Sequence, residues 1–205
     1  MATITEGKTL HRAHLYDFGT MLFGGVMRRL HRRVIERAAI ARGDRVLDVG
    51  CGPGRLTLDA ARAAGPTGET VGLDASREMI ALATHKGVAA GSPASFRVAA
   101  IEAIPAADDH FDVVLASLML HHLPDALLRR ALAEVRRVLR PGGRVIVLEL
   151  KGMPGHGLGH LLCVLGLRRG SEHAEHLRAR LREAGFEAVT VEPAGRGFCL
   201  IDARK

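Results

Sequence analysis

Aromatic side chains are scarce in this chain of 205 residues, which has no tryptophan, one tyrosine and six phenylalanines. Proteins that bind single-stranded nucleic acid use such side chains as platforms on which bases stack. The formal net charge of +7 would by itself suit nucleic acid or an anionic membrane surface. Because the positive charge is mostly arginine spread along predicted helices, we expect no nucleic-acid partner.

Cysteines and long apolar runs are also few. Three widely spaced cysteines do not suggest a disulfide framework, and Cys163 and Cys199 lie at ordinary apolar positions. The longest apolar stretch, residues 161–167, is far shorter than the roughly 20 residues of a membrane-spanning helix. The first residues lack the apolar core of a signal peptide. The sequence therefore predicts a cytoplasmic protein with no transmembrane segment.

Predicted strands and helices alternate along most of the chain. The apolar pattern and the turn residues predict strands at residues 45–49, 69–73, 95–99, 112–117 and 144–150, and helices at 55–64, 77–87 and after Pro124. A helix at 172–184 and strands at 187–192 and 197–203 follow. We expect Ser76 and Ser171 to cap helices and Gly185 to end one. This alternation predicts an α/β fold with a doubly wound, mostly parallel sheet, helices on both faces and a C-terminal antiparallel hairpin.

The chain is expected to form one domain over residues 1–205. Its parts are an N-terminal helical cap, a ligand-binding core, a substrate cover, and a C-terminal helix and hairpin, at residues 1–42, 43–150, 151–171 and 172–205.

The second N-terminal helix, predicted at residues 21–41, is amphipathic. Its apolar stripe is expected to consist of Leu22, Val26, Leu30, Val34 and Ala38. Most of the other face is basic, with Arg28, Arg29, Arg32, Arg33 and Arg37. Such a face is either solvated or in contact with an acidic partner or lipid headgroups, so peripheral membrane contact through these arginines stays open.

A glycine-rich turn follows the first predicted strand. Residues 45–49 are rich in branched apolar side chains, as in a parallel strand covered on both faces. Gly50, Gly52 and Gly54 then allow a tight turn and a close approach of the backbone to a ligand, because no Cβ is in the way. With the carboxylate of Asp48 beside it, this turn suits a ligand that carries both an ammonium and a carboxylate group.

Ligands of open α/β sheets bind at the carboxyl ends of the strands, near the point where the strand order reverses. This rule places Asp48, Asp74, Ala100 and Ser117 along one crevice. Asp74 follows the glycine turn at about the distance expected of an acid that pairs with ribose hydroxyls. Nicotinamide cofactors and S-adenosylmethionine both contain a ribose, so this acid does not separate them.

The spacing of the glycine turn favours S-adenosylmethionine over a nicotinamide cofactor. Residues 48–54 read Asp-x-Gly-x-Gly-x-Gly, and Arg55 stands where the dinucleotide fingerprint requires its third glycine. Later landmarks are Phe-Asp-Val-Val-Leu-Ala-Ser at 111–117, Leu-His-His-Leu-Pro at 120–124 and Leu-Arg-Pro-Gly-Gly at 139–143. With these segments the chain resembles the class I S-adenosylmethionine-dependent methyltransferases. It is similar to the branch that includes the ubiquinone/menaquinone biosynthesis methyltransferases.

The resemblance implies the strand order 3-2-1-4-5-7-6 and S-adenosylmethionine as cofactor, with S-adenosylhomocysteine as product. It also implies that the glycine turn contacts the methionine part, that Asp74 binds the ribose, and that Ala75 and Met79 border the adenosine. The expected cofactor contacts are Asp48, Gly50, Cys51, Gly52, Gly54, Asp74, Ala75, Met79, Ala100, Ile101 and Ser117.

One segment departs from the family pattern. The family often places an acid just after the third strand to bind the adenine amino group, whereas residues 99–102 read Ala-Ala-Ile-Glu here. The departure leaves room for a protein of this fold that binds the cofactor without methylating, such as a cyclase or a scaffold.

The basic surface also leaves open an RNA or protein methyltransferase. No Asn-Pro-Pro-Tyr or Asp-Pro-Pro-Tyr segment follows the fourth strand, which disfavours enzymes that methylate exocyclic amines of nucleic acids.

Histidines are the candidates for acid–base chemistry. His121 and His122 follow the fourth strand, where one of them could serve as a general base for a hydroxyl or ammonium acceptor. Two adjacent histidines cannot both face the pocket, so the sequence leaves the choice between them open. Ser117 has no Ser-His-Asp arrangement around it and is expected to line the cofactor site.

Two further histidine pairs have spacings that would suit a metal ion on one helical face. They are His156 with His160 and His173 with His176. Neither pair has an evident third ligand, so we expect no metal site.

The acceptor is predicted from the cover and the few aromatic residues. The apolar, glycine-rich segment 151–171, with Tyr16, Phe18, Phe23 and His160 as substrate contacts, suggests a lipophilic small molecule. A quinone precursor or another secondary metabolite would fit.

Overall fold

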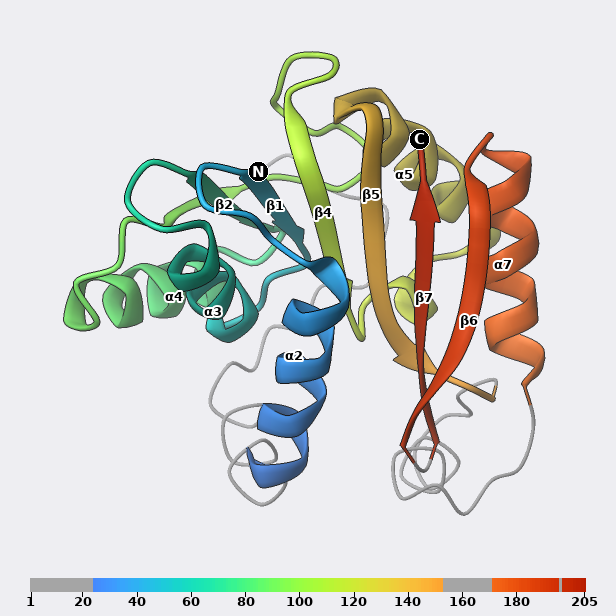
Figure 1. Cartoon of the computed structure of the whole chain (residues 1–205), viewed down its shortest axis with the longest axis horizontal. Coiled ribbons are helices and arrows are strands. Elements are labelled where there is room, and N and C mark those ends of the chain that lie inside the picture. Colours follow the sequence, from blue (N-terminus) through green and yellow to red (C-terminus); the bar gives the residue numbers. More distant parts are fainter. Residues whose placement is uncertain (1–23, 153–170, 196) are drawn as a thin grey trace.

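The structure is a computed structural model of the chain and describes residues 24–152, 171–195 and 197–205 (Figure 1). Its elements, in chain order, are α2 (Gly24–Ala38), β1 (Arg45–Val49), α3 (Arg55–Ala64), β2 (Glu69–Asp74), α4 (Arg77–Ala89), β3 (Ser95–Val98), β4 (Phe111–Ser117), the 3-10 helix η1 (Leu120–His122), α5 (Asp125–Val138), β5 (Leu139–Leu150), α7 (Glu172–Glu183), β6 (Glu187–Gly195) and β7 (Phe198–Arg204). Among the described residues, no helix is both long and apolar enough to cross a membrane.

The strands form one seven-stranded sheet in the order β3-β2-β1-β4-β5-β7-β6 (Figure 1). The first five strands pair in parallel, and β7 runs antiparallel to both β5 and β6. The predicted doubly wound sheet, its strand order and its C-terminal hairpin are therefore confirmed. In the register, Asp48 of β1 lies opposite Gly72 of β2 and Leu115 of β4. The carboxyl ends of these three strands consequently meet at one edge of the sheet.

Helices cover both faces of this sheet, as predicted (Figure 1). Strand residues alternate between two apolar cores, because successive side chains point to opposite faces. On one face, α5 and α7 pack on residues such as Leu47, Val114 and Val147. On the other, α2 and α3 pack on residues such as Val113 and Ile146. The central strands β1, β4 and β5 are thus largely buried on both faces, as their branched apolar composition predicts.

Two strand boundaries differ from the prediction by more than one residue. β5 begins at Leu139 rather than at residue 144, because Leu139 pairs with Phe111 ahead of the Pro-Gly-Gly segment. The pairing is irregular there, so the apolar pattern does not reveal it. β6 continues beyond residue 192 to Gly195, again through an irregular pairing.

The predicted helix ends are partly confirmed. Ser76 caps α4, since its Oγ accepts a hydrogen bond from the amide of Met79 at 3.3 Å. Gly185 follows the end of α7 with a φ of 85°, and the amide of Phe186 donates to the carbonyl of Leu181, as in a Schellman motif. Ser171 is the N-cap residue of α7, as predicted, but its side chain makes no capping hydrogen bond. The amide of Ala174, which such a cap would bind, donates instead to the carbonyl of Lys151.

The apolar stripe of α2 also needs a correction. Leu30, Val34 and Ala38 are buried as predicted, but Val26 is 47% exposed. A strict step of four residues drifts around a helix that has 3.6 residues per turn. His31 joins the buried face instead.

Two of the arginines on α2 bind the C-terminal hairpin. Arg33 donates to the carbonyl of Pro193 at 3.0 Å. Arg37 pairs with Asp202 at 3.1 Å and with Glu192 at 3.3 Å. The basic face of α2 is therefore in part an internal contact.

The connection between β3 and β4 contains no helix and is held by one arginine of α5. Arg137 donates to the carbonyls of Ile104 and Ala106 at 2.9 and 2.8 Å and pairs with Asp108 at 2.7 Å. Glu134 pairs with Arg137 and accepts from the amide of Ile104. These contacts lower the pKa of Glu134 below its ordinary value. The guanidinium of Arg137 thus holds the segment between β3 and β4 against α5.

We predict that Arg137→Met destabilises the protein. Loss of the guanidinium leaves two carbonyls of the segment without this donor, which should lower the free energy of unfolding by about 1–3 kcal/mol. Arg136→Met is the matched control, because Arg136 on the same helix makes one exposed bond to the carbonyl of Gly185. Urea unfolding of both variants measures the difference. Equal midpoints for the two variants would contradict this role of Arg137.

Candidate functional site

The glycine turn between β1 and α3 is closely packed on two sides and open at its centre. A Cβ on Gly50 would lie 2.7 Å from the side chain of Met119, and one on Gly54 would lie 2.8 Å from the ring of Phe96. A Cβ on Gly52 would meet no atom of the described residues within 4 Å. The first and third glycines therefore serve packing, whereas Gly52, at a φ of 52°, leaves room for a ligand beside the backbone.

Asp48, at the carboxyl end of β1, is a buried carboxylate with one oxygen in use. Oδ2 accepts a hydrogen bond from Thr57 Oγ1 at 2.6 Å. Oδ1 is buried, and no residue that the structure describes bonds to it. Burial, with the nearby charge of Asp74, raises the pKa of Asp48 to about 7. A cationic group placed at Oδ1 would satisfy that oxygen and stabilise the ionised form.

Asp74, at the carboxyl end of β2, connects the glycine turn to the start of α4. Its Oδ2 accepts from the amide of Gly52 at 2.9 Å, and its Oδ1 accepts from the amide of Ser76 at 2.8 Å. Burial raises the pKa of Asp74, and these two bonds oppose the rise. Because each carboxylate oxygen has two lone pairs, the side chain can accept two further hydrogen bonds, as from a pair of hydroxyls.

The residues expected beside the adenosine lie around the ends of β2 and β3. Met79 on α4 is buried, as are Ala100 and Ile101 after β3, and Ala75 is partly exposed. The amide of Ala99, the residue before this pair, donates to the carbonyl of Asp74 at 3.1 Å. The described backbone thus brings the two segments together.

Cys51 is a buried thiol within the turn. Burial, together with the charges of Asp48 and Asp74, raises its pKa well above the ordinary value. Its amide donates to the carbonyl of Leu73 at 2.9 Å and so joins the turn to β2. A protonated thiol is a poor nucleophile, which agrees with a structural role for this cysteine.

Ser117 ends β4 next to a histidine that sequence reasoning did not select. His31 of α2 places Nε2 at 3.4 Å from Ser117 Oγ. Burial lowers the pKa of His31 to about 4, with a further effect of the Arg55 charge, so this imidazole is neutral near pH 7. The helical period places His31 on the buried face of α2, and this position was the signal that could have identified it.

A second buried pair lies on the opposite face of the sheet, after β4. His121 Nδ1 is 2.6 Å from Glu149 Oε1, and the two side chains are 3% and 0% exposed. Glu149 also accepts from the amides of His121 and Leu150. Despite its burial, the pKa of Glu149 lies below its ordinary value, because His121 bonds to it and pairs with its charge. An acidic residue inside a fully buried strand was the signal for Glu149, which sequence reasoning missed.

The histidines around this pair have different surroundings. The rings of His121 and His122 have centroids 3.9 Å apart, and His122 is partly exposed. His173 of α7 is buried with its ring centroid 6.2 Å from that of His121. His176 instead lies 3.2 Å from Asp125. Within the described ranges, no group of three or more metal-ligating side chains is close enough to hold an ion.

Some predicted residues lie outside the described residues. These are the expected substrate contacts Tyr16, Phe18, Phe23 and His160, together with His156 and Cys163. The described residues bring the glycine turn, Asp74 and the segment after β3 together at the carboxyl ends of the strands. His121 lies on the opposite face of the sheet, against Glu149.

Comparisons with known proteins agree with this geometry. Residues 46–143 match the model of a methyltransferase domain family. The chain is 40% identical over 139 residues to a ubiquinone/menaquinone biosynthesis C-methyltransferase of Geobacter sulfurreducens, covering 65% of this chain and 53% of the relative. It is 33% identical over 201 residues to the Pseudomonas aeruginosa protein of the same name, covering 85% of this chain and 78% of that protein.

An arsenite methyltransferase of Halobacterium salinarum is 35% identical over 161 residues, covering 76% of this chain and 40% of that protein. The chain thus spans about half of some of its curated relatives.

Solved structures show the same fold. A methyltransferase from Aquifex aeolicus that depends on S-adenosylmethionine superposes with a TM-score of 0.71 at 21% identity, covering 85% of this chain and 88% of that one. The [4+2]-cyclase SpnF superposes with a TM-score of 0.70 at 26% identity, covering 86% and 80%. Together with the glycine turn, the two carboxylates and the strand order, these matches show that the chain belongs to the class I S-adenosylmethionine-dependent methyltransferases and is related to their ubiquinone/menaquinone biosynthesis branch.

Proposed function

We propose that this protein transfers the methyl group of S-adenosylmethionine to a lipophilic small-molecule acceptor, such as a quinone precursor or another secondary metabolite. The observation that carries the proposal is the buried contact between Glu149 and His121 after β4. The loop that contains His121 also contains Met119, which packs on Gly50 of the glycine turn. The names of the Geobacter and Pseudomonas relatives support a quinone acceptor.

The described residues fit the cofactor. Asp48 Oδ1, which has no partner among the described residues, suits the ammonium of the methionine part of S-adenosylmethionine. The space beside Gly52 leaves room for the carboxylate of the same part. Asp74 has lone pairs left for the ribose hydroxyls, and its bond to the Gly52 amide fixes the turn. When bound, S-adenosylmethionine supplies an electrophilic methyl group.

Of the two candidate bases, the contacts favour His121. A carboxylate on Nδ1 fixes the orientation of the ring and stabilises the imidazolium that forms when Nε2 accepts a proton. Glu149 occupies that position at 2.6 Å. We infer that His121 Nε2 takes the proton that a hydroxyl or an acidic carbon loses as it is methylated. Next to it, Met119 packs on Gly50, so the loop of His121 is in contact with the turn.

Two alternative functions differ from the proposed one in the acceptor: one has no methyl acceptor, and the other methylates arsenite. SpnF, a cyclase, makes a non-methylating role the second candidate. The arsenite methyltransferase relative raises arsenite as an acceptor. Soft metalloids bind thiolates, but burial raises the thiol pKa values of Cys51 and Cys199, which lie on a turn and on β7. The described cysteines therefore do not favour arsenite.

Contact with an anionic membrane surface is proposed for the exposed arginines of α2. Arg28, Arg29 and Arg32 are exposed, and Arg32 pairs only with the equally exposed Glu36 among the described residues. Arg33 and Arg37 are held by the hairpin, which reduces the basic face available to lipid.

The function is tested by measuring S-adenosylhomocysteine release with an acceptor panel of a demethylated naphthohydroquinone, arsenite and transfer RNA. We expect turnover with the naphthohydroquinone and a mass increase of one methyl group in that product. Cofactor binding without turnover on any acceptor would favour the non-methylating role, and turnover on arsenite or RNA alone would overturn the lipophilic acceptor.

We predict that Glu149→Gln lowers kcat by at least about tenfold and leaves the KM for S-adenosylmethionine within about twofold, because the neutral amide no longer stabilises a charged His121. The pH dependence of kcat should change as well. Glu183→Gln, an exposed carboxylate on α7, is the control. If Glu149→Gln lowers thermal stability but leaves kcat and its pH profile intact, Glu149 is structural only.

We predict that cofactor affinity rises with pH through the titration of Asp48. The folded-state pKa is raised to about 7, so the free protein holds a proton on Asp48 at pH 6, and an ammonium ligand must displace it. S-adenosylhomocysteine should therefore bind more tightly at pH 8 than at pH 6 and release a proton at pH 6, seen as a buffer-dependent enthalpy. Asp48→Asn should abolish both effects, and Asp59→Asn, a carboxylate on α3, should retain them. A pH-independent affinity in the wild type would rule out this linkage.

A further inference from the structure

A cavity of about 230 Å³ lies away from the cofactor crevice, between the sheet and the connection from β3 to β4. Its lining is formed by Leu47, Glu69, Val71, Leu73, Arg97, Ile104, Pro105, Ala106, Ala107, His110 and Phe111. The strand residues among them belong to the face that α5 and α7 cover elsewhere in the sheet. Here the covering layer is the helix-free segment that Arg137 holds.

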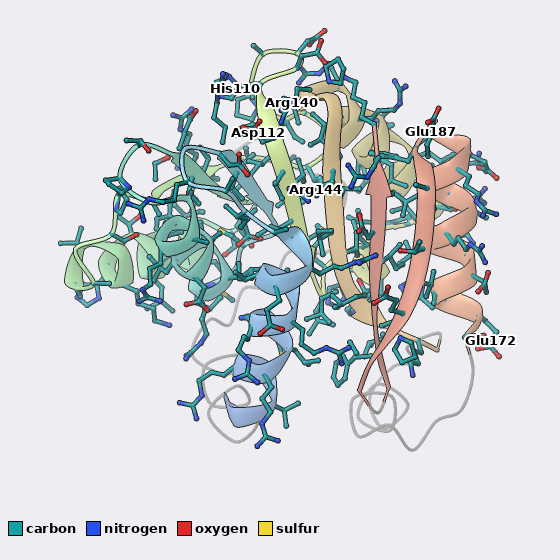
Figure 2. All side chains as sticks on the ribbon, viewed as in Figure 1. His110, Asp112, Arg140, Arg144, Glu172 and Glu187 are labelled. Carbon is teal, nitrogen blue, oxygen red and sulfur yellow. The ribbon has the colours of Figure 1, made fainter. Side chains whose placement is uncertain are left out.

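The position of this cavity separates it from the proposed methyl-transfer site. Glu69 begins β2, and His110 directly precedes β4, so the cavity reaches the amino ends of these strands. Figure 2 shows His110 at the upper end of the sheet, where β4 begins. Asp74 and Ser117 stand at the other ends of the same two strands. Ser117 lies on the other face of the sheet as well, since it contacts His31 of α2.

The wall of the cavity on the sheet is apolar. Leu47, Val71 and Leu73 form the wall on the sheet with Phe111, the first residue of β4. Ile104 lines the cavity from the connecting segment. All five side chains are buried in one core. The volume is below the roughly 300–1,000 Å³ of sites for drug-sized ligands. A cavity of about 230 Å³ suits a small body of one or two rings.

The charged groups at the cavity differ in their hydrogen-bond and ion-pair partners. His110 Nε2 lies 2.7 Å from Glu69 Oε2, and His110 Nδ1 lies 3.5 Å from Arg45 Nη1. Because the guanidinium can only donate, Nδ1 accepts, and Nε2 carries the hydrogen that goes to Glu69. Arg97, in contrast, is exposed and has no hydrogen-bond or ion-pair partner in the part of the chain that the structure describes. One unpaired guanidinium thus stands at the rim of an apolar cavity.

We propose that this cavity is a second ligand site, which binds a small aromatic carboxylate. The rings would fill the apolar interior, and the carboxylate would pair with Arg97, whose planar donors match its two oxygens. A single guanidinium gives one bidentate pair, which suits a monocarboxylate better than a multiply charged phosphate. The covering segment starts near Ala100 and Ile101, so the ligand would contact the same connection that borders the cofactor crevice.

The test is an NMR titration of the ¹⁵N-labelled full chain, saturated with S-adenosylhomocysteine, with 2-naphthoate and with its neutral analogue 2-naphthamide. We expect saturable shifts of amides in residues 69–73, 97 and 104–111. Arg97→Met removes the charge and should weaken 2-naphthoate at least about fivefold, while 2-naphthamide changes by less than about twofold. Ala106→Leu reduces the cavity and should weaken both probes. Arg28→Met, an exposed arginine of α2, is the control.

Three results would overturn the proposal. One is the absence of saturable shifts with 2-naphthoate. Another is a set of shifts centred on residues 48–52 and 117–122, which would place the probe in the methyl-transfer crevice. The third is equal weakening of 2-naphthoate by Arg97→Met and by Arg28→Met, which would indicate only a general effect of charge. Because the readout is binding, none of these depends on methyl transfer.

Discussion

The hydrogen bond from the Gly52 amide to Asp74 is the contact on which the candidate site depends. It connects the turn after β1 to the end of β2, and Asp74 in turn binds the first amide before α4. Asp48 lies beside this turn with one oxygen left over. Two buried carboxylates next to each other cost free energy unless cations or donors reach them. Two acidic side chains therefore lie next to each other at the ends of neighbouring strands, where a ligand with an ammonium and hydroxyl groups would replace lost solvation.

The two faces of the sheet divide the chemistry between them. Asp48 and Ser117 face α2 and α3, where the described contacts suit recognition of the cofactor. Glu149 and His121 lie on the face of α5 and α7. There the His121 imidazole stabilises the ionised form of the buried Glu149 carboxylate. The strand alternation that builds two apolar cores thus also separates the binding carboxylates from the carboxylate–histidine pair. The loop after β4 joins them, because Met119 packs on Gly50.

Much of this arrangement follows from the sequence because it depends on local signals. Apolar alternation and turn residues predict the strands and helices, and the Asp-x-Gly-x-Gly-x-Gly spacing predicts the crevice. Contacts between distant segments have no such signal, so Glu149, His31 and the hold of Arg137 on the β3–β4 connection were missed. The missing side-chain bond of Ser171, the N-cap residue of α7, has the same origin, since the carbonyl of the distant Lys151 accepts from the amide of Ala174.

The most direct test of the account is calorimetric binding of S-adenosylmethionine and S-adenosylhomocysteine to the wild type and to Asp74→Ala. The account predicts that the wild type binds both in the micromolar range and that the variant binds at least about tenfold more weakly, or roughly 1.4 kcal/mol. No binding to the wild type, or equal affinity in the two proteins, would contradict the assignment of this crevice to the cofactor.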